Sequence, residues 1–172
     1  MPAPLRVVFM GTPAFALPAL RALHETSDVA NVVAAHTQPD RPAGRGKKIT
    51  KPPVKVLAEE LGLPVFQPDD INHPDERRKL ADQIADVCVV AAYAQFLSPG
   101  ILNLPRVGCV NIHSSLLPKY RGAAPIQYAI WKGESETGGR VNPKPASRRC
   151  GSFPRWTPAR SSCRKKSRSA PA

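Results

Sequence analysis

Apolar residues in this chain form short continuous runs separated by amphipathic segments. The runs predict buried strands, because a parallel strand covered on both faces is apolar at nearly every position. The amphipathic segments, with apolar residues three or four positions apart, predict helices. We predict strands at 5–10, 29–35, 64–66, 85–92 and 107–113, and helices from residue 13 and at 54–61, 75–85, 97–102 and 124–132. This alternation predicts an α/β fold with a mostly parallel sheet covered on both faces.

The carboxyl ends of the predicted strands indicate where a ligand would bind, because open parallel sheets bind ligands beyond those ends. Gly11-Thr12 follows the first strand, and Asn111 to His113 close the last one. We therefore expect these two segments to lie beside one site. The segment from Thr37 to Pro53, rich in Pro, Gly and Lys, predicts a long exposed loop.

Positive charge is concentrated at the end of the chain. The formal net charge is +12, with 25 Lys and Arg against 13 Asp and Glu over 172 residues. Ten of the 25 basic residues and no acidic ones fall in 139–172, which leaves 15 basic and 13 acidic residues in 1–138. The first part is thus an ordinary domain with its own core. We expect residues 139–172 to be a disordered basic tail.

The remaining composition excludes several classes of protein. Cys88 and Cys109 lie in apolar runs and are expected to be buried reduced thiols, while Cys150 and Cys163 have no metal-ligand spacing. We expect no metal site. The first residues do not resemble a signal sequence, and no run approaches the roughly 20 apolar residues that span a bilayer. We expect a cytoplasmic monomer.

Asn111 and His113 are the best candidates for chemistry. Strand alternation places them on the same side of the last strand. An amide can donate a hydrogen bond to a carbonyl oxygen that gains negative charge, and an imidazole can move the proton of an attacking amine. The pair therefore suits acyl transfer. Taken by itself, Asn-x-His is also compatible with two residues that merely cap a strand.

The longer motif resembles a known family. Asn111-Ile-His followed by Ser115-Leu-Leu-Pro118 is similar to the signature of formyltransferases that use 10-formyltetrahydrofolate. Three further segments resemble the branch that formylates initiator methionyl-tRNA: residues 8–13, 37–48 and 119–127. The resemblance runs from about residue 5 to residue 138. It implies a Rossmann-like formyltransferase domain.

The resemblance also implies roles for individual residues. Asn111 and His113 would be the catalytic pair, and the folate donor would contact a short segment directly after them. The cations of the loop would contact the tRNA acceptor end, which agrees with the affinity of mobile basic loops for phosphates. The implied folate-binding residues are Ser115, Leu116, Leu117 and Pro118, and the implied tRNA-binding residues are Arg41, Arg45, Lys47 and Lys48.

The chain departs from the family after about Gly138. The family has a third catalytic residue, an aspartate in a Leu-Asp-Thr-Gly-like motif, whereas this chain has no Asp or Glu after Glu136. We also expect the domain to be incomplete at its C-terminal end and the family's C-terminal tRNA-binding barrel to be absent. This implies an inactive or impaired enzyme.

Codon degeneracy suggests an origin for the tail. Arg140 to Ala146 can be encoded by nucleotides that, read one position back, give Lys-Gly-Glu-Ser-Glu-Thr-Gly, the sequence of residues 132–138. In that shifted frame, Trp156 to Ala159 permits Leu-Asp-Thr-Gly. A short tandem duplication that shifted the frame explains both coincidences. The alternative is a genuine basic tail that binds RNA.

The sequence thus predicts a formyltransferase domain acting on methionyl-tRNA. Two alternatives remain open at this point. One is a formyltransferase of the sugar-nucleotide type, against which residues 123–127 and the lysine-rich loop argue. The other is a non-catalytic basic fragment that binds RNA through the loop and the tail.

Overall fold

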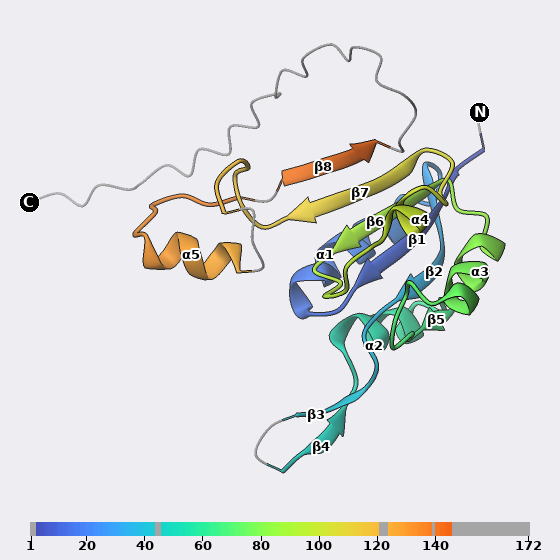
Figure 1. The fold of residues 1–172 in the computed structure, drawn as a ribbon, viewed down its shortest axis with the longest axis horizontal. Coiled ribbons are helices and arrows are strands. Elements are labelled where there is room, and N and C mark those ends of the chain that lie inside the picture. Colours follow the sequence, from blue (N-terminus) through green and yellow to red (C-terminus); the bar gives the residue numbers. More distant parts are fainter. Residues whose placement is uncertain (1–2, 44–45, 121–123, 139, 146–172) are drawn as a thin grey trace, which may run out of the picture.

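The computed structural model describes residues 3–43, 46–120, 124–138 and 140–145. Its centre is a six-stranded sheet (Figure 1) in the order β5-β2-β1-β6-β7-β8. The strands are β1 (Leu5–Gly11), β2 (Ala30–His36), β5 (Val65–Phe66), β6 (Val87–Ala91), β7 (Gly108–His113) and β8 (Arg140–Pro145). The first five are parallel, and β8 pairs antiparallel with β7.

Helices cover both faces of the sheet. The helices are α1 (Leu17–Glu25), preceded by the 3-10 turn η1 (Ala14–Ala16), α2 (Pro53–Glu60), α3 (Pro74–Asp82), α4 (Pro99–Leu102) and α5 (Pro125–Trp131). Alternation along β1 decides which side chain meets which layer. Phe9 packs in a cluster with Leu20 of α1. Met10 packs in a second cluster with Leu80 of α3 and Ile101 of α4. The predicted α/β fold with both faces buried is confirmed.

The close approach of η1 to the end of β1 requires a glycine. A Cβ added to Gly11 would lie 2.9 Å from Ala16 Cβ and 3.0 Å from Ala91 O. A larger residue would push η1 away from the sheet edge. Gly11 therefore sets the position of the turn that follows, which lies at the site described below.

The predicted loop at 37–53 is wrong in one respect. It contains a two-stranded antiparallel hairpin, β3 (Arg41–Ala43) and β4 (Lys48–Thr50). The hairpin projects from the body beyond α2 (Figure 1). We call residues 41–50 the basic arm. The composition of the segment is that of a loop, but two extended pieces on either side of a turn can still pair through their main chains.

The expectation of disorder from residue 139 is also wrong for β8. Residues 140–145 pair with β7 along its whole length, from Gly108↔Pro145 to His113↔Arg140. Without β8, the main-chain groups on that edge of β7 would be unpaired, and such an edge accepts an extended segment through main-chain bonds. Pro143 and Pro145 lack an N–H and are tolerated because β8 is itself an edge strand. Residues 146–172, the rest of the predicted tail, lie outside the described residues.

The two cysteines of the core behave as expected. Cys88 and Cys109 are buried thiols that form no disulfide, on directly paired positions of β6 and β7. The hydrogen bond with the neighbouring Cys109 thiol, together with burial, raises the pKa of Cys88, so it stays protonated. Cys150 and Cys163 lie outside the described residues. No helix in the described part of the chain is long and apolar enough to cross a membrane.

Candidate functional site

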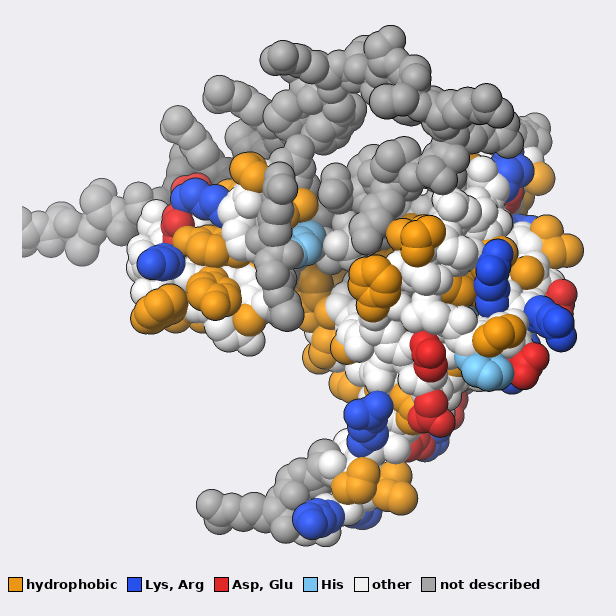
Figure 2. Space-filling model, in the orientation of Figure 1, with side chains coloured by type: hydrophobic (Ala, Val, Ile, Leu, Met, Phe, Trp, Pro, Cys, Tyr) orange, Lys and Arg blue, Asp and Glu red, His pale blue; other side chains and the backbone are white. Residues whose placement is uncertain are grey.

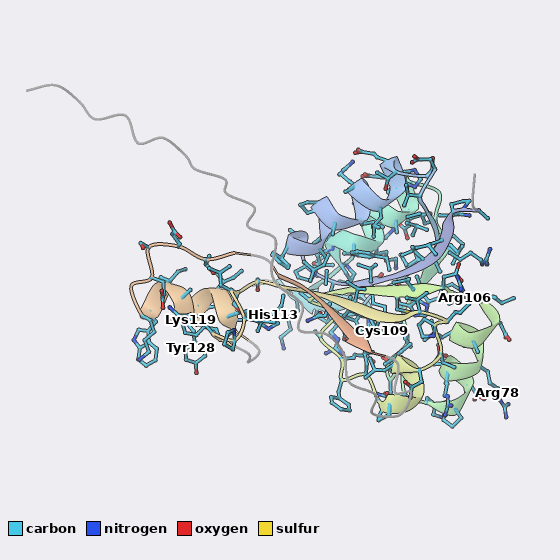
Figure 3. All side chains as sticks on the ribbon, turned by 90° about the horizontal axis from the view of Figure 1, so that it is seen from above. Arg78, Arg106, Cys109, His113, Lys119 and Tyr128 are labelled. Atoms are coloured by element: carbon cyan, nitrogen blue, oxygen red, sulfur yellow. The ribbon has the colours of Figure 1, made fainter. Side chains whose placement is uncertain are left out.

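Asn111 and His113 lie at the carboxyl end of β7 and line one cavity of about 520 Å³. Figure 3 shows His113 where the sheet gives way to the segment that carries α5. Both side chains are half-buried, so each can meet a ligand while part of it remains fixed by the protein. The prediction that the two residues share one environment is confirmed. The volume is within the range of about 300–1,000 Å³ typical of small-molecule sites.

Another part of the cavity wall comes from the turn after β1. Thr12, Pro13 and Phe15 line it, together with residues after β6 and Pro125 of α5. Phe15 is 40% exposed, an unusual exposure for a phenylalanine. None of the described lining residues is Lys or Arg. Among the described residues, this wall is therefore uncharged and mostly apolar.

A second hollow, of about 220 Å³, also borders Asn111. Its walls come from the end of β6, the following loop and α4, and it includes Tyr93, Phe96, Leu97 and Leu102. Asn111 lines both hollows, so its amide can reach a ligand that occupies either one. Tyr93 is buried with its hydroxyl unpaired in the described structure, and burial raises its pKa.

Ser115 fixes the tautomer of His113. The Ser115 hydroxyl is fully buried and donates to Lys119 O at 2.7 Å. A hydroxyl has one proton, so at 3.0 Å it can only accept from His113 Nδ1. Neutral His113 therefore carries its proton on Nδ1 and leaves a lone pair on Nε2. That is the form in which an imidazole accepts a proton from a substrate.

The four residues predicted to contact folate follow His113 in the chain and lie outside the lining of both hollows. Ser115 is buried against the ring, Leu116 is 52% exposed, and Leu117 precedes a cis bond to Pro118. All four are described, and none is among the residues that line either hollow. The structure thus brings Ser115 to His113, and it does not place the four residues around the cavity.

The cations predicted to contact tRNA lie on the basic arm. Arg41, Lys47 and Lys48 are exposed, and Arg45 lies outside the described residues. Figure 2 shows blue Lys and Arg side chains at this end of the molecule, away from the main body. None of the three described cations lines the 520 Å³ cavity.

Sequence reasoning missed Phe15 and the residues after β6. The signal was present, because the rule that placed the site at the end of β7 applies equally to the neighbouring strands β1 and β6. Residues 92–97 follow β6 directly. No cluster of three or more His, Cys, Asp or Glu suited to a metal ion occurs in the described part of the chain.

The fold and the paired amide and imidazole at the end of β7 define an α/β transferase domain. Residues 5–142 match the family described as formyl transferase. The chain belongs to this family of folate-dependent one-carbon transferases, which use 10-formyltetrahydrofolate as formyl donor.

Solved structures of the same fold include two glycinamide ribonucleotide formyltransferases and one deformylase. A phosphoribosylglycinamide formyltransferase from Bacillus halodurans has 22% identity and a TM-score of 0.63, over 80% of this chain and 71% of that one. Glycinamide ribonucleotide transformylase 1 from Symbiobacterium toebii has 18% identity and a TM-score of 0.65, over 86% and 69%. A formyltetrahydrofolate deformylase from Pseudomonas syringae pv. tomato has 21% identity and a TM-score of 0.61, over 84% of this chain but only 47% of that one. These likenesses show the fold.

Proposed function

We propose that this chain carries the catalytic half of a methionyl-tRNA formyltransferase. The reaction would transfer the formyl group of 10-formyltetrahydrofolate to the α-amine of initiator methionyl-tRNA. The observation that carries the proposal is the cavity shared by Asn111 and His113, with the His113 tautomer set by Ser115. The initial resemblance of residues 37–48 and 119–127 to the tRNA-acting branch supports the acceptor.

The two side chains would divide the chemistry between them. As the amine adds to the formyl carbon, the Asn111 amide donates a hydrogen bond to the oxygen that becomes negatively charged. The His113 Nε2 lone pair takes the proton released by the amine. When the bond between the formyl carbon and the donor nitrogen breaks, the same proton passes from His113 to that nitrogen. Atoms and charge balance with no further reactant.

The donor would occupy the second hollow beside Asn111. Its aromatic and aliphatic walls, from Tyr93 to Leu102, suit the flat face of a reduced pterin. The single amide that lines both hollows would then lie at the boundary between donor and acceptor. Ser115 to Pro118 would act on this arrangement through His113 rather than by lining the donor's hollow.

The turn after β1 argues against an acceptor whose phosphate binds at this turn, as that of glycinamide ribonucleotide could. Phosphate-binding turns in this position are rich in glycine and use free backbone N–H groups at a helix N-terminus. Here the turn is Gly11-Thr-Pro-Ala-Phe15, where Pro13 has no N–H and Phe15 presents an apolar ring. An acceptor whose amine is flanked by an unbranched apolar side chain fits this wall better.

The missing carboxylate limits the expected rate. Ser115 can orient His113, but a neutral hydroxyl does not stabilise the imidazolium as an acid would. The chain has no Asp or Glu after Glu136. We therefore propose slow transfer, well below that of a domain with the acid.

Single-turnover formylation of methionyl-tRNA with 10-formyltetrahydrofolate tests the proposal. Wild type should form formyl-methionyl-tRNA, while Asn111→Ala and His113→Ala should each reduce the rate by about 100-fold. His24→Ala, an exposed histidine of α1, is the matched control and should behave as wild type. Formylation of glycinamide ribonucleotide or of an amino-sugar nucleotide in preference to methionyl-tRNA would contradict the proposal that methionyl-tRNA is the acceptor. Equal rates in wild type and His113→Ala would reject the site.

A further inference from the structure

The base of the basic arm is held by a carboxylate that two other segments contact. Asp40, the residue before β3, accepts from Lys55 Nζ at 2.7 Å and from Gln67 Nε2 at 2.7 Å. Lys55 lies on α2, and Gln67 directly follows β5. The side chains of Lys55 and Asp40 are only 15% and 26% exposed, so water screens this pair less than an ordinary surface pair.

A second set of bonds connects this carboxylate to the loop that lines the hollows. Gln67 Nε2 also donates to Gln38 O at 2.8 Å, so both of its protons are used. Gln38 in turn donates through Nε2 to Tyr93 O at 3.2 Å and accepts from Arg41 Nη2 at 3.4 Å. The first cation of the arm and the loop after β6 thus share one glutamine.

The connection ends in the cavity wall. Tyr93 O accepts a second hydrogen bond from Thr12 Oγ1 at 3.0 Å, and Thr12 lines the cavity of Asn111 and His113. Thr12 O also accepts from Val54 N at 3.3 Å, which joins the start of α2 to the same turn. Two routes therefore run between the arm and the cavity, one through Gln38 and one through α2.

The negative charge of Asp40 indicates that this residue has a role other than binding phosphates. Hydrogen bonds from Lys55 and Gln67 lower the pKa of Asp40, so it is negatively charged at neutral pH. A negative charge beside a basic arm opposes the binding of phosphates. Its presence there is explained if it holds the arm in place.

We propose that Asp40, Lys55 and Gln67 are positioning residues that fix the orientation of the basic arm relative to the catalytic cavity. Through Gln38 and Thr12, an RNA held by the arm and a ligand in the cavity would be aligned with each other. The alignment of RNA rests on the proposed function, whereas the fixing of the arm does not.

Hydrogen exchange tests the positioning without any ligand. In Asp40→Asn and in Lys55→Gln, peptides covering residues 37–52 should exchange about fivefold faster, while the peptide of α3 stays unchanged. Lys51→Gln is the matched control, because Lys51 pairs with Glu59 at 2.7 Å on the exposed surface of the same region. It should leave exchange of the arm as in wild type. The double variant Asp40→Asn/Lys55→Gln should resemble either single variant, because the two groups act as a pair. Unchanged exchange in both single variants overturns the proposal.

RNA binding gives a second readout whose sign separates positioning from charge. The probe is a fluorescent RNA hairpin with an unpaired 3′-terminal ACCA, measured by anisotropy. Positioning predicts that Asp40→Asn weakens binding by about threefold, although a negative charge has been removed. Electrostatics alone predicts tighter binding, and that result overturns the alignment of RNA. If wild type does not bind the hairpin, the tRNA-directed function fails, while the exchange experiment still decides whether the arm is fixed.

Discussion

His113 Nδ1 donates a hydrogen bond to Ser115 Oγ at 3.0 Å, and Ser115 Oγ donates its own hydrogen bond to Lys119 O at 2.7 Å. The direction of the second bond dictates that of the first. A loop carbonyl four residues beyond the serine therefore determines which imidazole nitrogen is free. This relationship orients the imidazole ring but adds no charge to it.

Ser115→Ala should release the imidazole. We expect a mixture of tautomers in place of the Nδ1–H form, because no acceptor remains for Nδ1. Nitrogen-15 chemical shifts of the His113 ring report the tautomer directly. Formyl transfer should fall by about three- to tenfold, the equivalent of one hydrogen bond. Ser114→Ala is the neighbouring control and should keep the tautomer of wild type. A pure Nδ1–H form in Ser115→Ala would contradict the assignment.

His36 should make folding stability depend on pH. It is fully buried against Phe66, and burial lowers its pKa below the ordinary value of 6.5 despite a hydrogen bond with Gln83. Because the unfolded chain takes up a proton near pH 6.5 and the folded chain only at lower pH, stability is lost as pH falls through that window. The slope should not exceed about 1.4 kcal/mol per pH unit for this group.

Urea unfolding at pH 8, 7, 6 and 5 measures this effect. His36→Leu should flatten the loss between pH 7 and pH 5, although it leaves Gln83 unpaired and lowers stability at pH 8. His24→Gln, at an exposed position of α1, should retain the pH dependence of wild type. A pH dependence in His36→Leu equal to that of wild type would show that other groups cause it.

Ile84 is a site where a substitution should stabilise the fold. It follows the C-terminal end of α3 with φ 48°, a left-handed conformation that a β-branched residue adopts at a cost. Its side chain is 72% exposed, so little packing is lost on replacement. Ile84→Asn should raise the free energy of unfolding by about 1 kcal/mol. Denaturant titration measures the change. Ile84→Val, which keeps the branch at Cβ, should bring no gain.

Substitutions of Phe15 and Phe96 should affect different ligands, the acceptor in the first case and the donor in the second. Phe15 lines the cavity of His113, and Phe96 lines the second hollow beside Asn111. Phe15→Ser should lower kcat/KM for methionyl-tRNA by about tenfold and leave the affinity for a folate analogue unchanged. Phe96→Ser should instead lower the affinity for the folate analogue. Calorimetry with 5-formyltetrahydrofolate and formylation kinetics distinguish the two effects. The same response from both variants would contradict the division of the site.

Much of the fold could be predicted because its signals are local. Continuous apolar runs such as Val87–Ala91 identify buried parallel strands, and the spacing of Leu17, Leu20 and Leu23 identifies α1. The position of Asn111 and His113 could also be predicted, because alternation and the rule of carboxyl ends depend only on the strand itself. The family was indicated by contiguous sequence motifs around Asn111 and His113.

Long-range contacts could not be predicted in this way. The basic arm and β8 lie in segments whose composition is that of loops, and they form strands because of main-chain pairing with a partner strand. The hollow after β6 became visible only when residues 92–102 were placed beside β7. Ser115, expected to contact a ligand, is hydrogen-bonded to His113.

By itself, then, the sequence determined the alternation of strands and helices, the buried thiols and the location of an amide and an imidazole on one strand face. Only the tertiary structure decided the tautomer of His113, the two hollows beside Asn111 and the connection from Asp40 to Thr12. The physical reason is the distance along the sequence between the residues that interact. Hydrophobic periodicity acts between residues a few positions apart, whereas Asp40 and Lys55, or Gln38 and Tyr93, meet only after the sheet has brought distant segments together.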